Sequence, residues 1–210
     1  MDEVLEQNIQ PTHKGNNKRT KIIIFSIVGL LIIAGGLFGW FKYQEKQKEK
    51  YATILAETSV EMYGEFLISS LIVSTYSTVW DTAIDNGRDF SLAISNYKEG
   101  LSEEGSLKDR EKQRDKIREN MKLLQNPPKE YMESYIILKQ LYGTYIKMME
   151  QAMSPSGSLL DFNRKTNDLY SQFEQQQEEL LITLPADVKK LRENYEKKKE
   201  KESDESEDEL

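Results

Sequence analysis

Histidine and cysteine, two of the side chains most used in catalysis, are almost absent from this sequence. Its 210 residues include one histidine, His13, and no cysteine. His13 precedes the uncharged segment 22–41, which we expect to cross a membrane, so it would lie on the opposite side from the rest of the chain. This position excludes a histidine-based catalytic triad or a multi-histidine metal site in the C-terminal module. The absence of cysteine excludes a thiol nucleophile and a disulfide framework. Neither a G-x-S-x-G nucleophile elbow nor a glycine-rich phosphate loop occurs. We expect a chain that is not an enzyme and that holds no cofactor.

Three aspartates are the only arrangement that suggests a metal site. Asp81, Asp85 and Asp89 recur at every fourth residue and could line one face of a helix. A hard cation such as Ca²⁺ takes about six to eight oxygen ligands. An EF-hand loop that started at Asp85 would have Gly87 in its third position and Phe90 in its sixth, where glycine is required. We interpret the aspartates as a solvated helix end and expect no metal.

Aromatic residues are the remaining candidates for a binding site, because the chain contains eleven tyrosines. Tyrosine joins an apolar ring to a polar tip, which suits both a half-buried core and a recognition surface. Structural packing is one interpretation, and a groove for a partner or ligand is the other. The residues that would form such a groove are Trp80, Tyr131, Tyr135, Tyr142 and Tyr145.

A segment of twenty uncharged residues, 22–41, is the strongest signal in the chain. It reads IIIFSIVGLLIIAGGLFGWF, and roughly 20 helical residues cross a hydrocarbon core about 30 Å thick. A buried core helix is one alternative, but no other segment is apolar enough to enclose it. A cleaved signal peptide is another, but its apolar region would be shorter and would end in an A-x-A-like pattern. We predict a retained transmembrane helix in the lipid bilayer, with Trp40 and Phe41 in an aromatic belt at its exit.

The orientation of this segment depends on its flanks. Basic residues lie on both sides of it, so their number alone does not decide. The short basic arm of residues 1–21 has no acidic residue after Glu6 and looks like the cytoplasmic flank of a signal anchor. We predict a single-pass protein of the cell membrane with a cytoplasmic N-terminus and an extracytoplasmic C-terminal module. Gly35 and Gly39 form a G-x-x-x-G pair, which is either a dimerisation face or ordinary membrane-helix composition.

Residues 42–196 are patterned as a stalk and several helices. Apolar residues spaced by three, four or seven predict a helix over 52–84, and Asn86 and Gly87 mark its end. Within this helix, residues 66–73 form the most apolar stretch outside the anchor, and we interpret them as a densely packed turn of the core. A short helix that ends near Gly100 follows.

The second half of the chain carries clearer start and stop signals. Ser106 with Asp109 resembles a capping box at the start of a charged helix, which the prolines at 127–128 must end. A heptad seam runs over 131–152. Ser158 with Asp161 supplies a second capping signature, and the proline at 185 separates the helix that follows from a last amphipathic helix.

Two long helices joined by a four-residue turn form an antiparallel hairpin, which can pack on the helix over 52–84. The fold class is therefore all-α, with a single N-terminal transmembrane helix followed by a three- or four-helix antiparallel bundle. Residues 200–210 hold seven acidic residues against one lysine and so carry most of the net charge of −7. We predict that the charged tail of residues 197–210 is disordered.

These patterns favour a non-catalytic binding or assembly module at the cell surface. Its partner would be another protein or a component of the cell envelope, and homo-oligomerisation is a further option. The chain has no broad basic surface, so nucleic acid is not an expected partner. One alternative is a sensory module for a small ligand that works with a signalling partner in the membrane. The other is the reversed topology, a cytosol-facing scaffold whose acidic tail meets a basic partner.

Overall fold

The computed structural model of this chain describes the backbone of residues 17–207 and the side chains of residues 39–202 and 205. Within this range the fold is all-α, as predicted, and contains no strand. No helix among the described residues is long and apolar enough to cross a membrane. Most of the predicted membrane segment, 22–41, and the arm before it lie outside the residues whose side chains are described.

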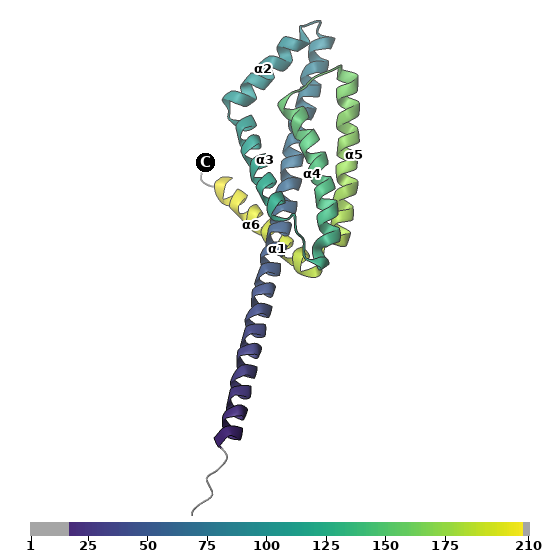
Figure 1. Cartoon of the computed structure of the whole chain (residues 1–210). Helices are drawn as coiled ribbons and strands as arrows, with labels where there is room; N and C mark the ends of the chain where they lie inside the picture. The colour runs from purple at the N-terminus through teal and green to yellow at the C-terminus, as the bar shows by residue number, and fades with distance from the viewer. Residues whose placement is uncertain (1–16, 208–210) are drawn as a thin grey trace, which may run out of the picture. The chain divides into compact units, whose positions relative to one another are not determined.

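The described backbone forms six α-helices and one short 3₁₀ helix joined by short connections, and the α-helices are labelled in Figure 1. The helices in the second half of the chain begin and end close to the residues that the start and stop signals of the sequence predict. In chain order the elements are α1 (Asn17–Asp85), α2 (Phe90–Glu103), α3 (Ser106–Leu123), η1 (Lys129–Tyr131), α4 (Met132–Met153), α5 (Leu159–Thr183) and α6 (Ala186–Glu207).

The helix ends follow from local chemistry. After α1, Gly87 adopts a φ of 61°, a left-handed conformation that glycine takes without steric cost. The Ser158 hydroxyl accepts a hydrogen bond from the backbone N–H of Asp161 (3.2 Å), so the predicted cap of α5 is confirmed. The predicted cap at Ser106 is wrong. Gly105 occupies the N-cap position of α3, and Ser106 already lies inside the first turn, where its hydroxyl makes no capping bond.

The chain divides into two compact units, Met1–Gln47 and Lys48–Leu210, and α1 begins in the first and ends in the second. The described part of the first unit is helical. Trp40 and Phe41 are exposed there and meet edge to face, with ring centroids 5.4 Å apart. Lys42 lies 3.8 Å from Glu45, one turn further along the helix.

The second unit is a helical bundle in which α1, α3, α4 and α5 lie side by side with alternating directions (Figure 1). The residues of α1 from Tyr51 onward form the centre of its core, where Leu55, Met62 and Val73 are fully buried. Each of the other α-helices contacts this part of α1. The contacts join Tyr76 to Tyr97 of α2, Glu65 to Arg110 of α3, Ser69 to Met149 of α4, Phe66 to Phe173 of α5, and Glu61 to Tyr195 of α6.

The prediction of disorder from residue 197 is wrong as far as Glu207, because α6 continues through this charged segment. Lys198 and Lys199 each lie within 4 Å of Glu202, at 3.7 and 3.9 Å. Oppositely charged side chains three or four residues apart stabilise a helix by about 0.2–0.5 kcal/mol per pair. Such local pairs stabilise a helix even where no apolar surface is buried. The prediction of disorder considered only the lack of apolar residues in this segment.

A candidate binding groove between α1 and α5

The five aromatic residues expected to form a binding groove do not form an open surface. Trp80, Tyr131 and Tyr145 are buried, whereas Tyr135 and Tyr142 are half-buried on α4. Trp80 packs against Phe90 and Phe162, and Tyr131 stacks on Tyr51 with ring centroids 5.3 Å apart. The helix pairs that these residues join close over three of the five rings. A role of the five residues in binding a partner stays a prediction.

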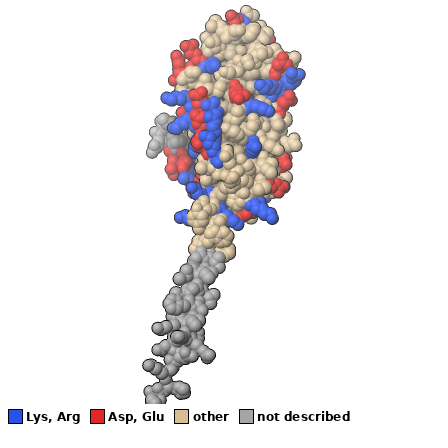
Figure 2. Space-filling model, viewed as in Figure 1, with Lys and Arg blue, Asp and Glu red and all other residues tan. Residues whose placement is uncertain are grey.

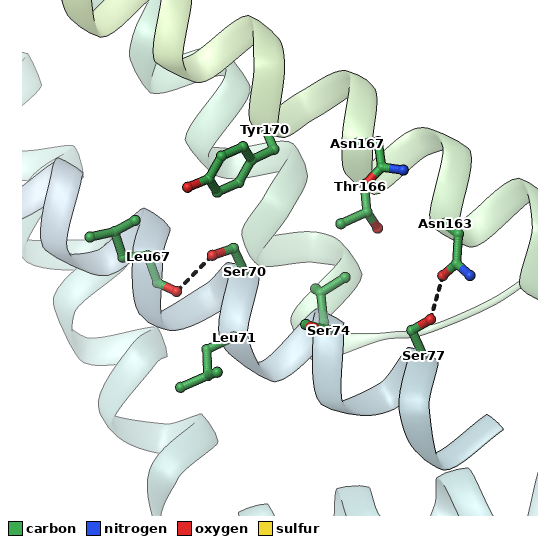
Figure 3. A pocket seen from close by; sticks show the side chains of 10 residues that line it. Leu67, Ser70, Leu71, Ser74, Ser77, Asn163, Thr166, Asn167 and Tyr170 are labelled. Carbon is green, nitrogen blue, oxygen red and sulfur yellow. Dashed lines mark hydrogen bonds between the residues drawn. The ribbon is translucent and has the colours of Figure 1, made fainter. Parts of the chain in front are cut away.

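The structure instead has a groove of about 700 Å³ between α1 and α5. Figure 3 shows residues of α1 on one wall and residues of α5 on the other, with side chains from both pointing toward the space between the helices. None of the residues that line the groove is charged, in a chain that is 31% charged. The lining consists of Leu67, Ser70, Leu71, Val73, Ser74, Ser77, Asn163, Thr166, Asn167 and Tyr170.

Hydrogen bonds fix part of the groove wall. The Ser77 hydroxyl donates to Asn163 Oδ1 (2.6 Å) and ties α1 to α5 at one end of the groove (Figure 3). The Thr166 hydroxyl donates to the backbone oxygen of Phe162 (2.8 Å) and accepts from Gln151 Nε2 (2.9 Å). Among the described residues, the Ser74 hydroxyl and the Asn167 amide have no partner. The groove therefore offers free donors and acceptors beside an apolar wall.

An aromatic stack holds the two helices together near Tyr170. The rings of Phe66 and Phe173 are parallel within 4°, with centroids 3.6 Å apart, and both are buried. Tyr170 packs against Phe66 at 5.9 Å and is 38% exposed. This stack and the Ser77–Asn163 bond connect α1 to α5 on the two sides of the groove.

The apolar stretch at 66–73 has a different role from the one predicted. Phe66, Ser69, Ile72 and Val73 are buried, as a core turn requires, but Leu67, Ile68 and Leu71 are exposed by 38%, 42% and 68%. Two of the three exposed side chains, Leu67 and Leu71, line the groove. The signal that could have found the groove is the lack of any charged residue from 66 to 80 on a helix that is not fully enclosed.

Charged side chains gather on the opposite side of α1, where α3 packs. Arg110 Nη1 lies 2.9 Å from both carboxylate oxygens of Glu65, and both side chains are largely buried. Burial raises the pKa of the Glu65 carboxyl above its usual value, although Arg110 acts in the other direction. One turn away, Glu61 accepts hydrogen bonds from Lys116 and from the Tyr195 hydroxyl (2.7 Å for the latter). These pairs join α1, α3 and α6.

The three aspartates lie at and just beyond the end of α1, and all three are exposed. Among the described residues, no group of three or more potential ligands is placed to hold a metal ion. Asp89 is the N-cap of α2, and its Oδ1 atom accepts hydrogen bonds from the backbone N–H groups of Ser91 (2.8 Å) and Leu92 (3.2 Å). This role as a helix-end residue agrees with the solvated helix end that the sequence favoured. His13 lies outside the described residues.

The glycine pair of the predicted membrane segment is only partly described. Gly35 lies among the residues whose side-chain surroundings are not described. Gly39 is exposed, and a Cβ atom added there would meet nothing within 4 Å. Dimerisation through this pair stays a prediction.

Acidic and basic side chains are intermixed on the face of the bundle drawn in Figure 2.

Comparison of the chain with known protein families, with curated proteins and with solved structures finds no match in any of the three.

Proposed function

We propose that this chain is a membrane-anchored, non-catalytic binding or assembly module whose groove between α1 and α5 docks an uncharged helical face of a protein. The observation that carries this proposal is the uncharged lining of a 700 Å³ groove in a chain that is otherwise rich in charge. Charged residues are depleted at the core of protein interfaces, and burying an unpaired charge is costly. An occupant of this groove therefore has to present uncharged side chains.

The shape of the groove favours a helix as the occupant. Residues 67–77 of α1 span about 15 Å at a rise of 1.5 Å per residue, and α5 forms the second wall alongside. A helix laid between two helices buries their side-chain ridges in its own grooves. The exposed Leu67 and Leu71 would supply apolar contact, and the Ser74 hydroxyl and the Asn167 amide would supply hydrogen bonds at the rim.

The membrane anchor of this proposal is the uncharged segment 22–41, with residues 48–207 on the extracytoplasmic side. We expect the full chain to resist extraction by alkaline carbonate and to be released by detergent. In intact cells, added protease should remove an epitope fused after Leu210 and leave one fused before Met1 protected. Protection of the C-terminal epitope alone would establish the reversed topology, and a chain soluble without detergent would refute the anchor.

Site-specific photocrosslinking tests the groove itself. In the full chain, Ser74 is replaced by a photoreactive phenylalanine analogue, with the same analogue at the exposed Ser102 of α2 as the control. We expect a discrete protein adduct from position 74 and not from position 102. The adduct should be lost in L71E and retained in L92E, since Leu71 and Leu92 are comparably exposed, at 68% and 59%. Adducts that are equal at both positions, or that survive L71E, would refute a docking role for the groove.

A small uncharged ligand is the second candidate for the groove. Its volume of about 700 Å³ lies within the range of about 300–1,000 Å³ that is typical of small-molecule sites. A ligand that binds only the folded state raises the midpoint of thermal unfolding. A reproducible increase with an uncharged compound, abolished in L71E, would favour this sensory alternative over protein docking.

A further inference from the structure

Residues 88–126 form a segment with few buried side chains, and we call this segment the α2–α3 arm. It contains α2 and α3 and lies between Gly87 and the two prolines at 127–128. Within this fully described segment, only five side chains are buried, namely Leu101, Leu107, Ile117, Met121 and Leu124. Helix α4 alone buries ten of its 22 side chains. Because burial of apolar surface is the main stabilising contribution to a fold, the arm is held less firmly than α4.

One face of α1 is covered by the arm. The Tyr51 hydroxyl donates to the backbone oxygen of Leu124, and Glu65 pairs with Arg110, so both ends of this face contact residues of the arm. Thr58 lies seven residues from Tyr51 and seven from Glu65, which is about two helical turns in each direction. The fully buried Thr58 therefore lies on the same face, beneath the arm.

Buried polar atoms without a partner are concentrated at this interface. Among the described residues, six buried side-chain atoms have no hydrogen-bond partner. One of the six, Gln151 Oε1, lies away from the arm, on α4 next to α5. The other five belong to the arm or to residues that face it, and they are Thr58 Oγ1, Glu61 Oε2, Tyr76 Oη, Arg114 Nε and Tyr145 Oη.

The neighbours of these groups place them against the arm. Glu61 pairs with Lys116 of α3 through its other oxygen, and the Tyr76 ring meets that of Tyr97 on α2 edge to face, with centroids 5.0 Å apart. The Tyr145 hydroxyl of α4 is influenced by the charges of two arginines of α3. A buried polar group without a partner raises the free energy of the closed state, and contact with water removes this cost. Opening of the arm would therefore relieve groups on α1, α3 and α4 together.

We propose that the α2–α3 arm is a hinged cover, which opens as one unit about Gly87 and residues 125–128 and exposes the face of α1 that carries Thr58 and Glu65. Proteins open locally in such cooperative units, at a lower free energy than global unfolding requires. The other helices stay packed while the arm is open, because the Phe66–Phe173 stack joins α1 to α5 without it. This inference does not depend on the proposed function, since no residue of the arm lines the groove between α1 and α5.

Thiol labelling tests the cover directly, because the chain contains no cysteine. Single-cysteine variants of the full chain in detergent, T58C beneath the arm and S69C as the control, are treated with a thiol reagent. Thr58 and Ser69 are both fully buried on α1, but the Ser69 hydroxyl contacts Met149 of α4, outside the arm. We expect T58C to be labelled about tenfold or more faster than S69C under native conditions, with equal rates in denaturant. Equal rates under native conditions would overturn the cover.

Hydrogen exchange of the full chain, first without any substitution, tests whether the arm opens as one unit. The amides of α2 and α3 should share one opening equilibrium constant, about tenfold or more above that of α4 and α5. R110M should raise this constant by the same factor in α2 and α3, although Arg110 lies on α3 alone. The control is K122M, which breaks only the exposed Lys122–Glu119 pair within α3 (2.6 Å) and should leave the constant unchanged.

Two outcomes of the exchange experiment would contradict the proposal. Protection of the α3 amides equal to that of the α4 amides would show that the arm does not open ahead of the rest of the bundle. An effect of R110M on α3 without one on α2 would show that the two helices open separately, and the single cover would be refuted.

Discussion

Buried tyrosine hydroxyl groups in this bundle fall into two classes. Tyr51 donates to the backbone oxygen of Leu124 (3.0 Å), and Tyr131 donates to Asp187 Oδ2 (2.6 Å). The hydroxyl groups of Tyr76 and Tyr145 have no hydrogen-bond partner among the described residues. A buried polar group left without a partner costs about 1–3 kcal/mol. The hydroxyl groups of Tyr51 and Tyr131 therefore stabilise the fold, whereas those of Tyr76 and Tyr145 destabilise it, although all four rings pack in the core.

Replacement of each tyrosine by phenylalanine should separate these classes. Y131F should lower the free energy of unfolding by about 1.5–3 kcal/mol, because it removes a hydrogen bond to a carboxylate. Y145F should leave it unchanged or raise it by up to about 1 kcal/mol, because it removes a hydroxyl group with no partner. Urea unfolding of the full chain in detergent, followed by circular dichroism, measures both. An equal loss in Y145F would mean that the Tyr145 hydroxyl has a partner after all.

At the scale of the helices, the sequence predicted most ends and one of the two caps. Glycine, proline and a Ser–Asp pair act within a few residues, so the ends of α1, α3 and α5 could be found without knowledge of the fold. The cap at Ser106 could not, because the turn before α3 contains only residues 104–105 and Gly105 takes the N-cap position with a φ of 80°. A one-residue shift in where a turn closes decides whether a serine caps a helix or lies inside it.

The two serines make a matched test of capping. S158A should destabilise the full chain by about 0.5–2 kcal/mol, because it removes the bond from the Asp161 N–H at the start of α5. S106A should change the free energy of unfolding by only a few tenths of a kcal/mol, because alanine is favourable inside a first turn. Denaturant unfolding of both variants gives the comparison. A larger loss in S106A than in S158A would show that Ser106 caps α3 in solution.

Helix α3 is attached to the bundle largely through charge. Only Leu107, Ile117 and Met121 of its eighteen residues are buried, and the Glu65–Arg110 pair fills the gap between the first two. Breaking a buried ion pair by removing one partner costs about 3–5 kcal/mol, whereas replacing both by apolar residues is often neutral or stabilising. The attachment of α3 therefore requires that Glu65 and Arg110 are present together, and it does not require that this position is charged.

A double-mutant comparison tests this dependence. R110M should destabilise the bundle by about 3–5 kcal/mol, because it leaves the Glu65 carboxylate buried without its partner. E65L/R110M should recover most of that loss. Hydrogen exchange of the α3 amides, compared with those of α4, shows whether the loss is local to α3. If E65L/R110M is as unstable as R110M, the two side chains stabilise the bundle independently.

At the scale of the whole molecule, the helical bundle could be predicted, but the groove could not. Periodicity identifies which face of a helix is apolar, and it gave the correct buried residues of α1 at Leu55, Met62 and Val73. It does not say how far apart two helices lie, and so it could not show that Leu67 and Leu71 stay exposed. It also could not show that α4 lies close enough to its neighbours to bury Tyr145.

The tyrosines also set the response of the whole bundle to alkaline pH. Burial raises the pKa of Tyr76 to about 12, and it raises the pKa values of Tyr51, Tyr131, Tyr145 and Tyr195 as well, with Asp187 and Glu61 adding to the effect at Tyr131 and Tyr195. The unfolded chain releases these protons near pH 10. The folded state therefore holds more protons than the unfolded state above pH 10, and the free energy of unfolding falls as the pH rises.

We expect the stability of the full chain to be insensitive to these tyrosines below pH 9 and to fall steeply between pH 10 and 12. Each tyrosine adds up to about 1.4 kcal/mol per pH unit to the slope. Y76F and Y145F should each reduce this slope by the contribution of one tyrosine. Each should leave the free energy of unfolding at pH 8 nearly unchanged, since neither hydroxyl has a partner among the described residues. Guanidinium unfolding at fixed pH values measures the slope. A slope that these variants leave unaltered would mean that the two hydroxyl groups already reach solvent in the folded state.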